Sequence, residues 1–140
     1  MCYRCVAACG KASIDAVRVA ARHLPDGPTL DPAIIASLPD AMREGQARFA
    51  DSGSIHAAAA FDPEGNLLAI HEDVGRHNAV DKTVGDLSAH GWPLEPTLLM
   101  VSGRISFEMV QKAAVAGIPV IAGVSGASTL AADLGDELGM

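Results

Sequence analysis

The most reactive residues of this sequence are its three cysteines, Cys2, Cys5 and Cys9, which all lie within the first nine residues. Their odd number and close spacing argue against a framework of disulfide bonds. Cys9 directly precedes Gly10 and a predicted helix that begins at Lys11. A helix N-terminus and a nearby lysine both lower the pKa of a thiol and favour the nucleophilic thiolate. Residues 1–10 are therefore interpreted as a loop that carries a reactive cysteine.

Three roles remain open for this cysteine loop. A thiolate could carry a persulfide or form a redox disulfide. Three thiolates could instead bind zinc, but a fourth ligand would be needed, and no second Cys-x-x-Cys motif follows downstream. A histidine could supply that ligand, although the pattern points to no particular one. An incidental role without chemistry is the third alternative.

A second group of candidate residues follows three predicted strands, in residues 72–78, 102–104 and 125–128. Each of these loops combines a glycine, a polar or basic side chain and the start of a predicted helix. Glycine lets the backbone approach a ligand closely, and the free N–H groups of a helix N-terminus attract anions. Arginine can hold a phosphate group through two hydrogen bonds. The loops therefore predict a pocket for a phosphate-bearing ligand such as a nucleotide, with candidate residues Arg76, His77, Ser102, Gly103, Arg104, Ser125 and Gly126.

Plainer interpretations exist for several of these residues. Glu72 and Asp73 stand beside Arg76 and His77, and such a group can be a salt-bridge network that merely fixes a turn. Lys82 by itself is typical of a solvated charge. A single histidine before a strand, such as His56, is more often a capping or core-edge residue than a ligand.

The hydrophobic pattern predicts the helices and strands that must position these loops. Helices are expected at residues 11–23, at 31–50 with an interruption at Pro39, at 77–89, at 106–116 and at 128–138. Residues 57–61 and 67–71 predict a β-hairpin, and the continuous apolar runs at 98–101 and 119–124 predict buried strands. Glu108 and Lys112 are expected to pair along their helix.

The order from residue 57 is β-β-α-β-α-β-α, which predicts an α/β fold with a three-layer α-β-α sandwich around a mixed sheet. The carboxyl ends of strands in such a sheet are the usual place for ligands. Residues 1–10 are assigned to the cysteine loop, and residues 11–140 are expected to form a single α/β domain after an N-terminal helical segment.

Composition excludes some functions. The formal net charge of -7 disfavours non-specific nucleic-acid binding, which needs clustered Lys and Arg. The sequence has no apolar run long enough for a transmembrane helix and no secretory signal pattern, so a cytoplasmic location without membrane attachment is expected.

Four longer segments can be compared with known families. They read CGKASI at 9–14, IHAA at 55–58, EDVGRHNAVDK at 72–82 followed by Gly85, and SGRISFEMVQK at 102–112 followed by AGIP at 116–119. Together they resemble the FdhD family of formate dehydrogenase accessory proteins over nearly the whole chain. The resemblance implies a domain of the cytidine-deaminase-like kind, which agrees with the predicted element order.

The resemblance also implies a function. FdhD-like proteins accept sulfur from a cysteine desulfurase and pass it to the molybdenum or tungsten cofactor of formate dehydrogenase, a bis(molybdopterin guanine dinucleotide). The predicted pocket would bind this phosphate-rich, guanine-containing cofactor as a client, and no permanently bound metal is expected. The family also favours a homodimer. A cofactor-binding chaperone without sulfur chemistry, or a zinc-dependent hydrolase, is the alternative function.

The cysteine loop departs from the family pattern Cys-Gly-x-Cys-Gly-Lys. When Gly10 and Lys11 are aligned, Cys9 matches the second cysteine and Val6 stands in the place of the first. Cys5 takes that role if the loop contains an extra residue, so Cys5 and Cys9 are the candidate catalytic residues. The family's N-terminal region and C-terminal segment are expected to be missing from this chain.

Zinc deaminases share the implied fold but need a His-x-Glu motif followed by Pro-Cys-x-x-Cys. The corresponding segment here is His56-Ala57-Ala58, and no cysteine follows Cys9. Deamination is therefore disfavoured.

Overall fold

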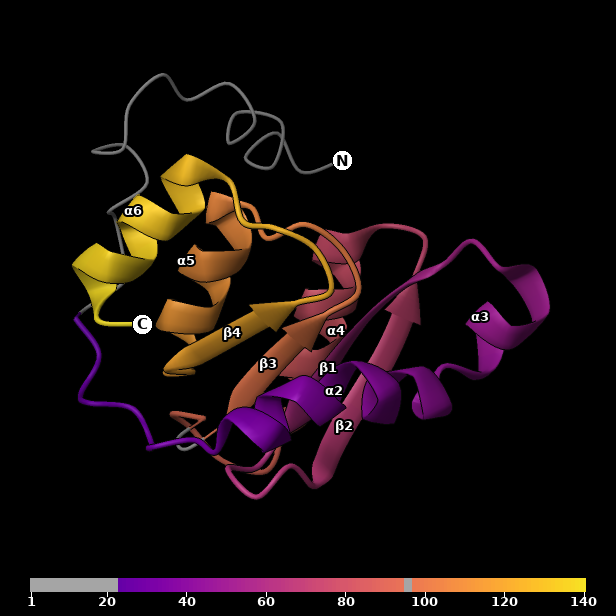
Figure 1. The fold of residues 1–140 in the computed structure, drawn as a ribbon, viewed down its shortest axis with the longest axis horizontal. Helices are drawn as coiled ribbons and strands as arrows, with labels where there is room; N and C mark the ends of the chain where they lie inside the picture. The colour runs from indigo at the N-terminus through magenta and orange to yellow at the C-terminus, as the bar shows by residue number, and fades with distance from the viewer. Residues whose placement is uncertain (1–22, 95–96) are drawn as a thin grey trace.

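The computed structural model describes residues 23–94 and 97–140, and it contains a sheet flanked by helices (Figure 1). The predicted order β-β-α-β-α-β-α is confirmed for the part of the chain after residue 55. The strands are β1 (His56–Phe61), β2 (Leu67–Asp73), β3 (Leu98–Val101) and β4 (Val120–Gly123), and the helices are α2 (Pro32–Gly45), α3 (Ala47–Ser52), α4 (Arg76–Ser88), α5 (Phe107–Val115) and α6 (Thr129–Leu138).

The strand directions bring the candidate loops to one edge of the sheet. The strand order is β2-β1-β3-β4, with β1 antiparallel to both β2 and β3, and β3 parallel to β4. The sheet is therefore mixed, as predicted, and β2, β3 and β4 run in the same direction. We call the edge at which these three strands end, and at which β1 begins, the carboxyl edge.

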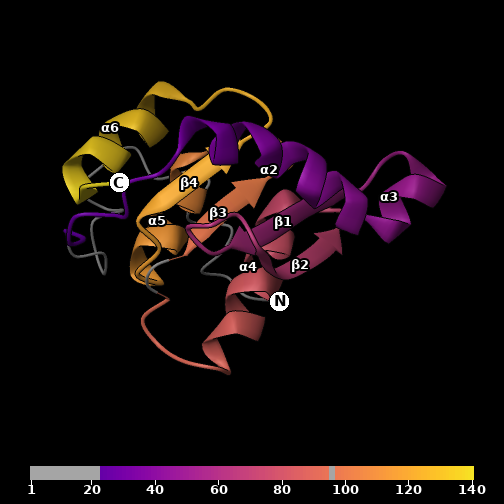
Figure 2. The same cartoon turned by 60° about the horizontal axis from the view of Figure 1, so that its bottom comes forward.

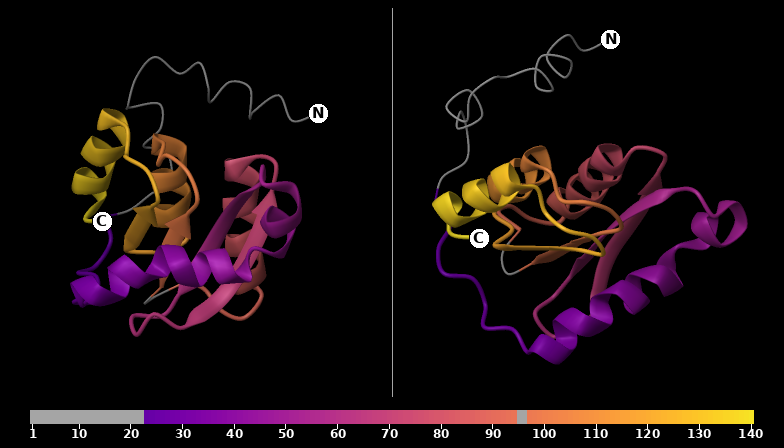
Figure 3. Two further views of the ribbon diagram at one scale, coloured as in Figure 1. Left: turned by 45° about the vertical axis from the view of Figure 1, so that its right-hand side comes forward. Right: turned by 45° about the horizontal axis from the view of Figure 1, so that its top comes forward.

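Helices cover both faces of the sheet, which confirms the three-layer prediction. Figures 2 and 3 show α2 on one side of the sheet and α4, α5 and α6 on the other. On the first face, Leu38 and Met42 of α2 pack in one core cluster with Phe61. On the second face, Ala58 and Leu99 belong to a larger cluster with residues of α4, α5 and α6. The run of alanines in β1 is almost completely buried, and its small side chains let helices pack close to the strand.

The hairpin between β1 and β2 is closed by an aspartate turn, as its sequence predicts. The Asp62 carboxylate accepts hydrogen bonds from the backbone N–H groups of Glu64 and Asn66, at 3.0 and 2.8 Å. Gly65 has a φ of 87°, a left-handed conformation that glycine adopts without strain.

The predicted interruption at Pro39 is wrong, because α2 continues through this residue and ends at Gly45. Proline lacks the N–H group that would bond to the carbonyl of Ile35. Ile35 is exposed, so solvent can satisfy that carbonyl, and the apolar stripe with Leu38 and Met42 keeps the helix on the sheet. The chain breaks instead at Gln46, between α2 and α3.

Three other predictions need comment. The helix predicted at residues 11–23 lies outside the described residues except for His23, which is not helical. β4 was predicted to be buried, but its residues are only partly buried because it lies at the edge of the described sheet. Glu108 and Lys112 do not pair along α5, since Lys112 binds Asp81 of α4 instead.

Within the described ranges, no helix is long and apolar enough to cross a membrane.

The turn after α5 provides a test of this packing. Gly117 has a φ of 79°, and a Cβ added there would lie 2.5 Å from Cβ of Pro93. Gly117→Ala should therefore lower the free energy of unfolding by about 1–2 kcal/mol or more in urea denaturation. Gly135→Ala in α6 is the matched control, because its Cβ would meet nothing within 4 Å. It should leave stability unchanged or raise it, and an equal loss in both variants would contradict the proposed clash.

Candidate functional site at the carboxyl edge

The carboxyl edge unites residues that are far apart in sequence. Gly103, in the loop after β3, is the point where they meet. A Cβ added to it would lie 3.5 Å from Cε1 of His56 and 3.9 Å from Cδ of Arg76. His56 stands at the start of β1 and Arg76 at the start of α4. The reversed direction of β1 therefore adds His56 to the group of loops that the sequence predicted.

The loops after β3 and β4 are joined by their backbones. The N–H of Ile105 donates to the carbonyl of Gly126 at 3.3 Å, and the N–H of Ser128 donates to the carbonyl of Ile105 at 3.0 Å. A Cβ on Gly123 would lie 3.0 Å from Ile105, so this position has little room for a larger residue. These contacts extend the parallel pairing of β3 and β4 into the loops and hold them as one unit.

A cavity of about 320 Å³ lies against this unit, and we call it the arginine cavity. The Nε atom of Arg76 is buried without a hydrogen-bond partner, and the side chain of Arg104 is exposed. A buried donor without an acceptor is unfavourable, and an anionic ligand could supply the acceptor. The start of α6 also faces this region, where its N–H groups favour negative charge. The residues lining the cavity are Arg76, Arg104, Ile105, Ser106, Gly126, Ala127 and Ser128.

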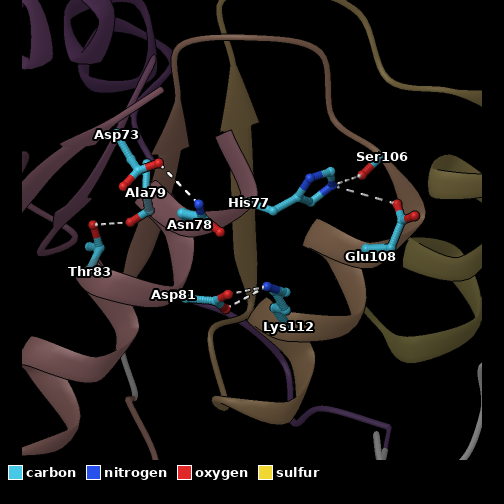
Figure 4. Close-up of polar contacts among 9 residues, drawn as sticks. All are labelled: Asp73, His77, Asn78, Ala79, Asp81, Thr83, Ser106, Glu108 and Lys112. Atoms are coloured by element: carbon cyan, nitrogen blue, oxygen red, sulfur yellow. Dashed lines mark hydrogen bonds and ion pairs between the residues drawn. The ribbon is translucent and has the colours of Figure 1, made fainter. Parts of the chain in front are cut away.

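His77 connects the arginine cavity to α5 (Figure 4). Its Nε2 atom lies 3.1 Å from Oγ of Ser106 and 3.8 Å from a carboxylate oxygen of Glu108. Partial burial lowers the pKa of His77 despite the opposing effect of Glu108, and the nearby charge of Arg76 lowers it further. The imidazole is therefore neutral near pH 7, and it can exchange a hydrogen bond with the Ser106 hydroxyl.

The acidic residues of the 72–82 motif have structural roles. Both carboxylate oxygens of Glu72 accept hydrogen bonds at 2.8 Å from the backbone N–H groups of Arg48 and Phe49, at the start of α3. The Asp73 carboxylate accepts from the N–H of Gly75 and the side chain of Asn78. The hydrogen bonds of Asp73 fix the turn that leads from β2 into α4.

Two basic residues of the same region also pair with acids. Lys82 forms an ion pair with Asp73, so it is not the free solvated charge that the sequence predicted. Lys112 and Asp81 form an ion pair between α4 and α5, as Figure 4 shows. The predicted charge network is thus present in part, but the described contacts do not include Arg76 in it.

A second and larger cavity, of about 790 Å³, lies between α2, α3 and the carboxyl edge. We call it the helical cavity. Ser102 and His56 are among its lining residues, and the Ser102 hydroxyl oxygen accepts a hydrogen bond from the N–H of Ala57 at 2.9 Å. Ser102 therefore lines the helical cavity while Arg104, two residues later, lines the arginine cavity.

The predicted ligand-binding residues are mostly brought together. Arg76, Arg104 and Gly126 line the arginine cavity, Ser102 lines the helical cavity, and Gly103 stands between them. His77 contacts the cavity residue Ser106.

Ser125 is exposed and is not among the lining residues of either cavity. The candidate catalytic residues Cys5 and Cys9 lie outside the described residues. In the ranges 23–94 and 97–140, no group of three or more His, Cys, Asp or Glu side chains is placed to hold a metal ion.

From the sequence, His56 was interpreted as a capping or core-edge residue, and Gln46 was not identified as a candidate site residue. His56 became a site residue only through the antiparallel direction of β1, which the hairpin prediction already contained. Gln46 follows the end of α2, and no motif marks it.

The structure is an α/β sandwich whose carboxyl edge carries two cavities, and comparisons with known proteins show its family. The model of the FdhD/NarQ family matches residues 3–140, and the chain belongs to this family.

Individual relatives are similar in sequence and structure. A sulfur carrier protein FdhD from Streptomyces avermitilis is 56% identical over 136 residues, covering 94% of this chain and 48% of that protein. The sulfur carrier protein FdhD of Mycobacterium tuberculosis is 49% identical over 138 residues, covering 94% and 49%. A crystal structure assigned as a formate dehydrogenase accessory protein from Desulfotalea psychrophila has a TM-score of 0.74 and 28% identity, covering 91% of this chain and 53% of that one. The chain spans about half the length of the curated relatives it matches.

The contact between Glu72 and α3 can be tested directly. Glu72→Gln keeps the size of the side chain but removes the charge that attracts the two N–H groups, so unfolding free energy should fall by about 0.5–2 kcal/mol. Glu64→Gln is the matched control, because Glu64 is exposed in the hairpin turn. Urea denaturation measures both variants, and an unchanged stability of Glu72→Gln would contradict the capping role.

The turn at Asp73 predicts a pH dependence. The hydrogen bond from Lys82 lowers the pKa of Asp73 from 3.8 to about 2, with further help from the N–H of Gly75 and from Asn78. Because the folded-state pKa is depressed, the stabilisation is present above pH 3.8 and is lost as the pH falls towards 2. In Lys82→Met, carboxyl-carbon NMR titration should show the pKa of Asp73 rising towards 3.8. A pKa that stays near 2 in this variant would assign the shift to the other contacts.

Proposed function

We propose that this chain is part of a sulfur carrier that transfers sulfur from a cysteine desulfurase to the molybdenum cofactor of formate dehydrogenase. Membership of the FdhD/NarQ family is the observation that carries this proposal. The names of the relatives, sulfur carrier protein FdhD, support the sulfur-carrying role. The name of the structural neighbour supports formate dehydrogenase as the client enzyme.

The first step of the proposed transfer takes place at Cys5 or Cys9. A thiolate attacks the terminal sulfur of a persulfide on the desulfurase. A new sulfur–sulfur bond forms on the carrier cysteine, the sulfur–sulfur bond of the donor breaks, and the desulfurase cysteine leaves as a thiolate. Lys11, two residues after Cys9 in the sequence, would favour the attacking thiolate over the thiol at Cys9.

The carboxyl edge would hold the cofactor, which is the substrate that receives the sulfur. The arginine cavity suits its phosphate groups, because the Nε of Arg76 lacks a partner and Arg104 adds a second guanidinium group. Gly103 and Gly126 leave room for the ligand to approach the backbone. Anchoring the phosphates would position the metal centre for transfer without a large entropic cost at that step.

His77 would tune this cavity rather than bind metal. Its neutral imidazole adds no positive charge of its own at pH 7, and it orients the Ser106 hydroxyl at the cavity wall. Ser106 could then share a hydrogen bond with a phosphate oxygen. The positive charge of the cavity therefore comes from the arginines.

The sulfur-transfer step is tested with the intact protein that carries this chain. After incubation with a cysteine desulfurase and cysteine, mass spectrometry should find one added sulfur atom that a reductant removes. The double variant Cys5→Ala with Cys9→Ala should lose this added mass and the ability to mature formate dehydrogenase.

Cys2→Ala is the matched control and should retain both properties. Normal maturation of formate dehydrogenase by the double variant would exclude transfer through a persulfide on these cysteines. A protein that takes up no sulfur but still binds the cofactor would instead be a cofactor chaperone.

A further inference from the structure

We propose that His77 is a proton-operated switch: when its imidazole gains a proton, its hydrogen bond moves from Ser106 to Glu108, and the wall of the arginine cavity attracts anions more strongly. The switch joins the start of α4, which carries His77, to the start of α5, where the other two residues stand. Its effect on anions rests on the proposed function, which supplies a phosphate-bearing ligand for this cavity.

The Ser106 hydroxyl is used in an unusual way for its position. Ser106 is the N-cap residue of α5, but its side chain accepts no hydrogen bond from the first N–H groups of this helix. Its Oγ atom lies instead 3.1 Å from Nε2 of His77. Ser128, the N-cap of α6, shows the usual arrangement, because its Oγ accepts from the N–H of Ala131 at 3.2 Å. The contact with His77 therefore draws the Ser106 hydroxyl away from its own helix.

Glu108 is a second partner within reach of the same ring nitrogen (Figure 4). Nε2 of His77 lies 3.8 Å from a carboxylate oxygen of Glu108, too far for a hydrogen bond, and the Glu108 side chain is only 19% exposed. A neutral imidazole can accept a hydrogen bond from the Ser106 hydroxyl at this nitrogen. A protonated imidazole can only donate there, and a carboxylate is then a better acceptor than a hydroxyl because the bond joins opposite charges. A small movement of either side chain closes the remaining distance.

The charged groups around His77 decide which acceptor a protonated ring prefers. Glu108 and Lys112 face it from α5, and Arg76 and Asp81 belong to its own helix. Partial burial is the largest effect and lowers the pKa of His77, Glu108 opposes this shift, and Arg76 adds to it. Lys112 is paired with Asp81, so these two charges largely cancel. Glu108 is therefore the acceptor to which a protonated His77 turns.

Protonation changes the wall of the arginine cavity in two ways. It adds one positive charge next to a cavity that Arg76 and Arg104 already line. It also frees the Ser106 hydroxyl, whose oxygen can then accept from the N–H of Met109, the residue that corresponds to Ala131 in α6. The hydroxyl proton is then available to an anion in the cavity. Both changes favour anion binding, so the affinity for anions should rise as the pH falls through the pKa of His77.

The hydrogen-bond switch can be tested without a ligand by NMR titration of the labelled chain from about pH 8 to about pH 5. The imidazole signals of His77 should titrate with a pKa below 6.5, and the amide signal of Met109 should move with the same midpoint. The amide signal of Ala131 should not follow His77, because Ser128 already caps α6. A Met109 signal that does not follow His77 overturns the proposal.

Three variants separate the switch from general effects of acid. His77→Gln keeps a polar group of similar reach but does not titrate, so the transition at Met109 should disappear. Glu108→Gln removes the charge that raises the pKa of His77, so this pKa should fall further. His90→Gln is the matched control, since His90 is exposed and contacts the carbonyl of Asp86, and it should leave the transition unchanged. An unchanged pKa of His77 in Glu108→Gln would contradict the role of the carboxylate.

Sulfate is the probe for the effect on the cavity, because its own charge is constant over this range of pH. Isothermal titration calorimetry of the wild-type chain should show sulfate affinity rising about threefold to tenfold from the upper to the lower end of the titration, as expected for one added charge nearby. This rise should be absent in His77→Gln and present in His90→Gln. Arg76→Gln should weaken sulfate binding at every pH.

The outcomes distinguish the switch from the proposed function. If sulfate binds through Arg76 with the same affinity at both ends of the titration, His77 does not control the cavity and the proposal is wrong. If sulfate fails to bind at any pH while Met109 follows His77, the phosphate site of the proposed function is wrong and the hydrogen-bond switch stands.

Discussion

The candidate site depends on the direction of one strand. β1 runs antiparallel to both of its neighbours, so β2, β3 and β4 all end at the edge where β1 begins. This arrangement brings three strand-to-helix loops and His56 together. The loops after β3 and β4 are then joined by backbone hydrogen bonds, which limits their freedom before any ligand binds. An edge preorganised in this way loses less entropy on binding than separate loops would.

The 72–82 motif divides into residues that build the edge and residues that lie at the arginine cavity. Glu72 caps α3, and Asp73 fixes the turn and pairs with Lys82. Arg76 and His77 follow directly and lie at the arginine cavity. A motif of this length therefore serves both cavities, since Glu72 supports the wall of one and Arg76 lines the other.

Much of the fold follows from local sequence signals, because alternating and continuous apolar runs specify strands and the helical period specifies α4, α5 and α6. The predicted break at Pro39 was wrong because the packing of Leu38 and Met42 outweighed the loss of one helical hydrogen bond. The arginine cavity was predictable, since its residues follow predicted strands. The helical cavity was not, because Gln46 and Phe49 reach the carboxyl edge only through the packing of α2 and α3 on the sheet. Contacts of that kind have no local signature.

We thus propose that ligands bind at the carboxyl edge of the sheet and that sulfur is carried by the cysteines near the start of the sequence. Ligand binding at this edge is tested by an NMR titration of the labelled chain with GDP, following backbone amide signals. Signals of Gly103, Ser106 and Gly126 should shift with a common saturation curve, while those of the hairpin turn at Asp62 and Asn66 should stay constant. Shifts confined to the hairpin turn, or none at the carboxyl edge, would contradict it.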